Sequence, residues 1–238
     1  MDSYYTAGYY VLKVLLQDQA WLHGKSVVTC SSCINQLAFD YWCFGWGSKP
    51  SAKDIKELDL SEDQINSITK WTNDRYRKEE IAFDRVFPTL ELASEYKSEF
   101  FPGRQDISIY CIDFPESDRI RLINDFAPGV KNGYDKSDGK IGLRQNLLKG
   151  KKTLEDDRIH FLGFDLIGVE VDGGFHSFHC HCIYNILESQ FGLKMNDHGL
   201  FDDIPDPESL RHYLNEPDTP VEDVPWYIVK VSRLLNGV

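Results

Sequence analysis

A long run of aromatic and branched apolar residues, His160–Val171 (HFLGFDLIGVEV), is typical of a β-strand, with a bend expected at Gly163 or Gly168. Runs of similar composition predict further strands at Tyr9–Leu16, Tyr41–Trp46, Ile107–Ile112 and Trp226–Leu234. Strands need partners for their backbone N–H and C=O groups, so these runs predict a sheet.

Segments with a helical spacing of apolar residues separate the predicted strands. Ser61-Glu62-Asp63-Gln64 is a capping box that opens a helix ending near Glu80, and Asp206-Pro207-Glu208 starts a short helix. The other predicted helices are Ser26–Asp40, Pro88–Phe100, Pro115–Phe126 and Ser177–Phe191. Because strands and helices alternate irregularly, we expect an α+β fold with a mixed or mainly antiparallel sheet and flanking helices.

The length and composition of the chain favour one globular domain over residues 1–238. Hydrophobic residues make up 42% and charged residues 27% of the 238 positions, and a chain of this size buries a sizeable core. The stretch Ala127–Lys152 is rich in glycine and lysine. It predicts an exposed excursion that carries a short helix near Leu143–Leu148.

The net charge of −12 restricts the partners that the chain can bind. An acidic protein repels phosphate backbones, so we do not expect it to bind nucleic acid. The same charge suits a basic partner, such as a nucleic-acid-processing enzyme. Acidity that serves solubility alone is the alternative interpretation.

The amino terminus lacks the basic and apolar regions of a signal peptide, and no apolar run is long enough to cross a bilayer. We therefore expect a cytoplasmic protein with no membrane association. In that reducing compartment the six cysteines should be free thiols or metal ligands.

The densest group of chemically reactive side chains lies between His176 and Cys182. Together with a Cys-x-x-Cys pair it offers a possible zinc site, whose candidate ligands are Cys30, Cys33, His176, His179, Cys180 and Cys182. A cysteine nucleophile with a nearby histidine or Asp172 is a second possibility. In a continuous helix both pairs of cysteines share faces with apolar residues, which favours a core role instead. The sequence does not place His176, His179 or His181 inside or outside the fold.

Acidic residues gather in the carboxyl-terminal third of the chain and offer a surface for a basic partner. The candidate partner-binding residues are Asp172, His176, Asp197, Asp202, Asp203, Glu208, Asp218, Glu222 and Asp223. The alternative for the carboxylates is a solvated face, with Asp206 capping a helix.

Several motifs in this sequence resemble a family of bacterial immunity proteins of polymorphic toxin systems. The resemblance is carried by Phe161-Leu162-Gly163-Phe164-Asp165, Gly173-Gly174-Phe175-His176-Ser177, Asn196-x-His198-Gly199-Leu200-Phe201 and Pro225-Trp226-Tyr227. A tyrosine-rich amino-terminal strand and the residues Trp42, Trp46, Ile68 and Trp71 also fit. The stretch Ala127–Lys152 shows no such likeness.

The resemblance implies a protein without catalytic residues or cofactor that binds and neutralises one cognate toxin domain, often a nuclease, in the cytoplasm of the producing bacterium. An acidic surface would suit a basic toxin of that kind. The alternatives are a zinc-binding or cysteine-dependent enzyme that uses the His/Cys cluster 176–182, and an interaction module in a larger assembly, such as a homodimer. The sequence leaves the oligomeric state, monomer or homodimer, open.

Overall fold

The structure is a computed structural model, and one antiparallel sheet organises the residues that it describes. Those residues are 3–14, 26–31, 36–37, 55–56, 58–82, 86–127, 141–153, 157–170 and 175–235. The strand order is β2-β1-β3-β6-β4-β5, and every neighbouring pair is antiparallel. The strands are β1 (Tyr4–Lys13), β2 (Gln36–Leu37), β3 (Ile107–Pro115), β4 (Ile159–Val169), β5 (Phe175–Ser177) and β6 (Trp226–Leu234).

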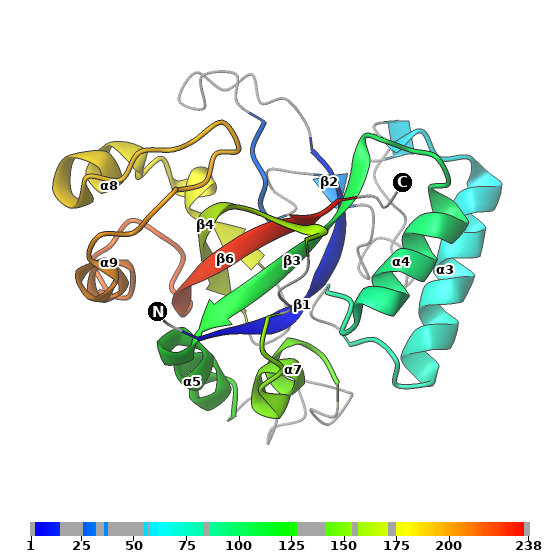
Figure 1. The fold of residues 1–238 in the computed structure, drawn as a ribbon, viewed down its shortest axis with the longest axis horizontal. Helices are drawn as coiled ribbons and strands as arrows, with labels where there is room; N and C mark the ends of the chain where they lie inside the picture. The colour runs from blue at the N-terminus through cyan, green and yellow to red at the C-terminus, as the bar shows by residue number, and fades with distance from the viewer. Residues whose placement is uncertain are drawn as a thin grey trace.

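Helices flank this curled sheet in three groups, and the α+β prediction is confirmed (Figure 1). α3 and α4 lie side by side at one end, α8 and α9 lie at the other, and α5 and α7 lie by the first half of β1 and the carboxyl end of β3. The helices are α3 (Glu62–Arg77), α4 (Leu90–Phe100), α5 (Glu116–Asp125), α7 (Leu143–Lys149), α8 (Tyr184–Phe191) and α9 (Pro207–Leu214).

The predicted helix starts depend on side-chain caps that the structure contains. The Ser61 hydroxyl accepts a hydrogen bond from the Gln64 backbone N–H, and the Gln64 side chain accepts one from the Ser61 N–H. Asp206 caps α9 by accepting the Ser209 N–H at 3.1 Å. Each cap satisfies backbone donors that have no partner within the helix, so the boundary is fixed locally.

Side-chain alternation along the strands divides the core into separate clusters. On β1, Tyr9 and Val11 pack beneath α3 and α4, whereas Tyr10 and Leu12 point to the opposite face. On β6, Trp226 packs with α8 and α9, whereas Tyr227 joins the cluster that contains Tyr10. The sheet is therefore buried on both faces, which explains why its strands read as continuous apolar runs.

The predicted helix Ser26–Asp40 is wrong in the part that the structure describes. Residues 27–31 are not helical, and the Val28 N–H donates to the carbonyl of His198 instead. Gln36–Leu37 pairs with β1 as a strand. Helical spacing was misleading because a segment that crosses the core also has apolar residues at irregular intervals. The predicted strand Tyr41–Trp46 lies outside the described residues.

The predicted continuous helix Ser177–Phe191 is also wrong. The chain forms β5, then a 3₁₀ turn at Phe178–His181, then a left-handed residue at Cys182 (φ 56°) before α8 begins. This break turns Cys180 and Cys182 outward, and both are exposed. The expectation that these two cysteines face the core is therefore incorrect, because it assumed one unbroken helix.

The predicted excursion at Ala127–Lys152 is partly wrong. Its short helix is confirmed as α7, but Leu143 and Leu147 are buried in the core cluster that includes β1. The Asn146 side chain also donates to the carbonyls of Ala7 and Pro88, which joins α7 to the sheet. Residues 128–140 lie outside the described part of the chain.

Gly163 bends β4 and allows a distant segment to contact the strand. Its φ is +146°, and the register with β6 shifts between Phe161 and Gly163. A β-carbon at this position would lie 2.7 Å from Cβ of Leu200 and 2.9 Å from the carbonyl oxygen of Phe201. Phe164 and Phe201 exchange backbone hydrogen bonds of 2.7 and 2.9 Å beside it. The bend predicted at Gly163 is confirmed, and its role is close packing.

We expect Gly163→Ala to destabilise the protein by roughly 3 kcal/mol or more, because a positive φ and a steric overlap act together. Gly192→Ala is the matched control: Gly192 also has a positive φ (+68°), but no atom lies within 4 Å of the added β-carbon. It should cost about 1 kcal/mol. Chemical denaturation of the two variants checks the difference, and equal losses would contradict the packing role of Gly163.

A buried carboxylate joins α5, α9 and β6. Asp118 is fully buried, and its Oδ1 accepts hydrogen bonds from Arg211 Nε at 2.8 Å and from Arg121 at 3.2 Å. Its Oδ2 accepts the Ile228 N–H at 3.2 Å. Burial raises the pKa of Asp118, while the two guanidinium groups oppose that shift. The ion pairs therefore offset a desolvation cost and fix the position of α9 against the sheet.

We expect Arg211→Met to destabilise the protein by about 3 kcal/mol, because it removes the closest charge partner of a buried carboxylate. The double variant Asp118→Asn/Arg211→Met should lose less free energy of unfolding than the sum of the losses of Asp118→Asn and Arg211→Met. Urea denaturation of the four proteins in this double-mutant cycle measures the coupling. Additive losses would show that the pair does not act as a unit.

Candidate functional site

Trp226, at the start of β6, is the buried residue against which the candidate site packs. Gly168 on β4 leaves room for it: a β-carbon on Gly168 would lie 2.9 Å from the Trp226 ring. The indole N–H donates to the carbonyl of Glu222 at 3.0 Å, and the His181 ring packs edge-on against the indole at 5.6 Å between centroids. One buried aromatic ring therefore positions residues from two other segments.

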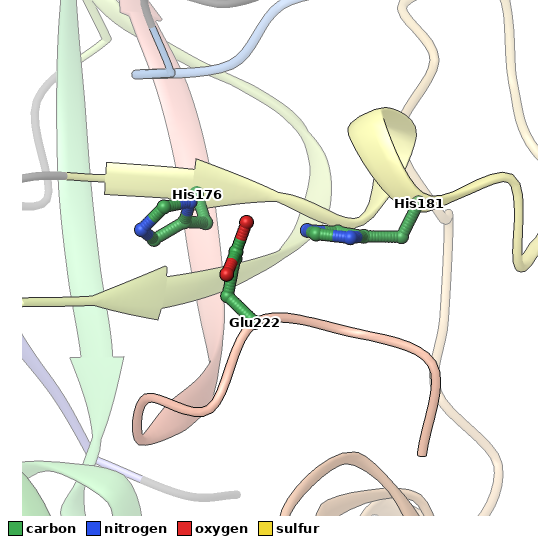
Figure 2. A group of neighbouring side chains, drawn as sticks. All are labelled: His176, His181 and Glu222. Atoms are coloured by element: carbon green, nitrogen blue, oxygen red, sulfur yellow. The ribbon is translucent and has the colours of Figure 1, made fainter.

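Three potential metal ligands meet beside Trp226. His176 comes from β5, His181 from the 3₁₀ turn, and Glu222 from the loop that precedes β6. One donor atom from each of the three side chains lies within 4.8 Å of the other two. Figure 2 shows the Glu222 carboxylate between the two imidazole rings.

The two histidines of this group have different surroundings. His176 Nε2 lies 2.7 Å from Oε1 of Glu170, so a carboxylate fixes the orientation of its ring. His181 Nε2 is buried without a hydrogen-bond partner among the described residues. Burial lowers the pKa of His181, with Glu222 opposing the shift, so the neutral ring with a free nitrogen lone pair is favoured.

A pocket of about 330 Å³ lies between the end of α5, the end of α9 and the loop before β6. Four carboxylates line it, and Arg121 is the only cation among the lining residues, which are Arg121, Asp125, Leu214, Asn215, Glu216, Pro217, Thr219, Val221, Glu222, Asp223, Val224 and Pro225. We call it the acidic pocket. Because Glu222 belongs to both features, the pocket and the His176–His181–Glu222 group adjoin.

Hydrogen bonds join the walls of the acidic pocket to the start of β6. Asn215 pairs with the backbone of Trp226, accepting its N–H at 2.9 Å and donating to its carbonyl at 3.2 Å. Arg121 also donates to that carbonyl and to Asp118, and it stacks over the Tyr227 ring. The guanidinium group of Arg121 is thus bound by other groups of the protein. The carboxylates at the opening therefore make the electrostatic potential of the pocket negative.

The structure separates the residues of the predicted zinc site. Among the described residues, the group that could hold a metal contains His176 but not Cys30, His179, Cys180 or Cys182. His179 is buried, its Nε2 lies 3.0 Å from the carbonyl oxygen of Gly199, and burial lowers its pKa to about 3. Cys33 lies outside the described residues. His179 therefore acts as a neutral core residue that holds the turn at Gly199.

The predicted partner-binding residues divide by position. Glu222 and Asp223 line the acidic pocket, and Asp218 is exposed on the loop that borders it. Asp202 accepts a hydrogen bond from Asn196, and Glu208 accepts one from Arg211 at 2.6 Å, so both have local structural partners. The other two described carboxylates, Asp197 and Asp203, are exposed, and Asp172 lies outside the described residues.

Sequence reasoning missed Asp125 and Glu216 in the pocket and His181–Glu222 as a pair. Asp125 lies near the end of a predicted helix, and nothing in the sequence marked it as a pocket residue. Its Oδ2 accepts a hydrogen bond of 2.7 Å from the Tyr227 hydroxyl. In the sequence, the motif Pro225-Trp226-Tyr227 indicated this region, because Trp226 contacts His181 and Glu222 and Tyr227 contacts Asp125 and Arg121. Only the fold reveals that residues so far apart in sequence converge.

A buried acid on β4 lies outside this site. Asp165 on β4 is buried, and its Oδ1 accepts the Leu166 N–H at 2.8 Å. Burial raises its pKa to about 7, although hydrogen bonds from Thr29 and Leu166 lower it. Asp165 in turn contributes to raising the pKa of buried Tyr10. This carboxyl group is therefore neutral in the folded protein under mildly acidic conditions.

Comparisons of the chain with protein-family models, with curated proteins and with solved structures found no match. Within the described residues, no helix has the length and apolar character that spanning a membrane requires. The fold and the site define the class of this protein as an α+β protein with an acidic pocket.

We expect Asp165→Asn to remove a pH dependence of stability. The folded-state pKa lies above that of the unfolded chain, so the stabilising contribution is complete below about pH 4 and disappears as the pH rises to about 7. Between pH 5 and 8 the wild type should lose about 2–3 kcal/mol more than Asp165→Asn.

Denaturant titrations at several pH values measure this difference. The exposed substitution Asp203→Asn removes one carboxylate without touching the core and serves as the control. The assignment fails if the wild type and Asp165→Asn show parallel pH profiles.

Proposed function

We propose that the protein is a cytoplasmic immunity protein that binds a basic toxin domain and blocks it. The acidic pocket is the observation that carries this proposal. Four carboxylates line this pocket of about 330 Å³. The one arginine that lines it donates hydrogen bonds to Asp118 and to the backbone carbonyl of Trp226. A site with this excess of negative charge favours a cationic side chain from a partner.

The chemistry of the pocket fits the guanidinium group of an arginine. Glu216, Glu222 and Asp223 lie on one loop and Asp125 on α5, so a planar guanidinium could donate hydrogen bonds to carboxylates on two sides. Leu214, Val221 and Val224 add apolar surface for the aliphatic part of the side chain. An arginine anchored at the centre of an interface is a common source of binding energy.

The charge of the rest of the chain supports the same function. Asp218 is exposed on the loop that borders the pocket, Asp202 and Asp203 are exposed on the loop before α9, and the whole chain carries a net charge of −12. A field of this sign accelerates encounter with a basic protein and repels nucleic acid. A nuclease, whose substrate site must attract phosphates, is the kind of toxin that such a surface suits.

The alternative, a cysteine-dependent enzyme, has less support. Cys180 and Cys182 are exposed, and among the described residues the group that could hold a metal joins His176 and His181 to Glu222 and contains no cysteine. A nucleophilic cysteine needs a base within hydrogen-bond reach and a group that orients the base.

Co-expression with the toxin domain encoded by the adjacent gene tests the proposal. We expect the wild-type chain to restore growth and to bind the purified toxin with an association rate that falls as salt is added. Glu216→Lys/Asp223→Lys should slow association at least about tenfold, because it reverses two charges at the pocket.

Glu62→Lys/Glu99→Lys is the matched control, since it makes the same charge change on exposed positions of α3 and α4. Continued killing of cells that express the wild type would overturn the proposed function. Equal effects of the two double variants would overturn the role of the pocket and leave only a general charge effect.

A further inference from the structure

We propose that His176, His181 and Glu222 form a binding site for a divalent transition-metal ion, with Zn²⁺ as the ion of choice. The set differs from the His/Cys ligands that the sequence suggested, because it excludes the cysteines and includes a carboxylate from a distant loop. It does not depend on the proposed immunity function.

The geometry of the three donors suits such an ion. Two imidazoles and one carboxylate are a common ligand set for zinc and for non-haem iron. Donor atoms about 2.0–2.2 Å from a tetrahedral ion lie about 3.3 Å apart. The three donors lie within 4.8 Å of one another, so small side-chain rotations close the distance. The Glu222 side chain is exposed, so it can rotate without disturbing the core.

An unsatisfied polar atom is the second observation that points to a ligand. Nε2 of His181 is buried and has no hydrogen-bond partner among the described residues. A buried polar atom without a partner is costly, and a metal ion between His181 and Glu222 would provide one. The packing of the ring against Trp226 holds that nitrogen in place.

Glu170 supplies the outer support that metal-binding histidines usually have. Its Oε1 lies 2.7 Å from Nε2 of His176. If His176 binds through Nδ1, Glu170 orients the ring and increases its basicity. Glu170 itself does not belong to the group of converging donors. The three protein ligands therefore leave the fourth position of a tetrahedral ion for water or a partner's side chain.

A metal ion here would join β5 and the 3₁₀ turn to the loop that forms one wall of the acidic pocket. That loop is held from the other side by Asn215. We therefore expect the ion to stabilise the folded protein and to reduce the net negative charge at the pocket.

Competition titration with a chromophoric chelator measures Zn²⁺ binding to the full chain prepared free of metal. We expect one ion per chain and a rise in Tm on addition of Zn²⁺. His181→Ala and Glu222→Gln should each weaken binding at least about 100-fold, and Glu170→Gln should weaken it about tenfold.

His212→Ala is the matched control. Nε2 of the exposed His212 lies 2.8 Å from Oε1 of Glu216. The substitution therefore removes a surface His–Glu pair without changing any of the three proposed metal ligands. Co²⁺ gives a spectroscopic readout: we expect the visible bands of a tetrahedral site without a thiolate charge-transfer band. Cys180→Ser/Cys182→Ser should leave affinity unchanged.

Three results would overturn the assignment: no stoichiometric Zn²⁺ binding, binding that His181→Ala and Glu222→Gln leave intact, or a thiolate band that disappears in the cysteine variant. Glu216 and Asp223 belong to the pocket but not to the metal group. Glu216→Lys/Asp223→Lys can therefore lose toxin binding while it retains Zn²⁺, and His181→Ala can show the reverse.

Discussion

The buried carboxylate of Asp118 holds together the parts of the molecule that form the acidic pocket. It lies on α5, accepts hydrogen bonds from Arg211 on α9 and Arg121 on its own helix, and accepts the backbone N–H of Ile228 on β6. Because a carboxylate without these partners would be strongly disfavoured in the core, the helices and the strand must keep their relative positions. The pocket lies between the same elements, so its shape depends on this interaction.

Two glycines extend this constraint to the rest of the site by allowing close contact. Gly163 lets the Leu200–Phe201 segment lie against β4, and Gly168 leaves space for the ring of Trp226. Trp226 then positions His181 and the backbone of Glu222. Gly163, Leu200, Phe201 and Trp226 therefore have packing roles. The proposed functions depend instead on the charged side chains that this packing presents.

The sequence predicted the elements whose causes are local. The Ser61–Gln64 capping box and the Asp206 cap fixed helix starts, because a side chain three residues away satisfies the first free N–H groups. The strand Trp226–Leu234 was predicted with its observed bounds. The predicted helices at Ser26–Asp40 and Ser177–Phe191 were wrong because apolar spacing does not show where a chain crosses a core or where a left-handed residue such as Cys182 breaks a helix.

The sequence by itself determined the acidic charge, the α+β class and the presence of reactive residues near His176, since these follow from composition and local pattern. Tertiary structure decided which of these residues meet. It turned Cys180 and Cys182 outward, buried His179 against Gly199, and brought Glu222 to His176 and His181 from more than forty positions along the chain. Convergence of this kind depends on the register of β4, β5 and β6, and strand register is set by packing across the whole sheet rather than by neighbouring residues.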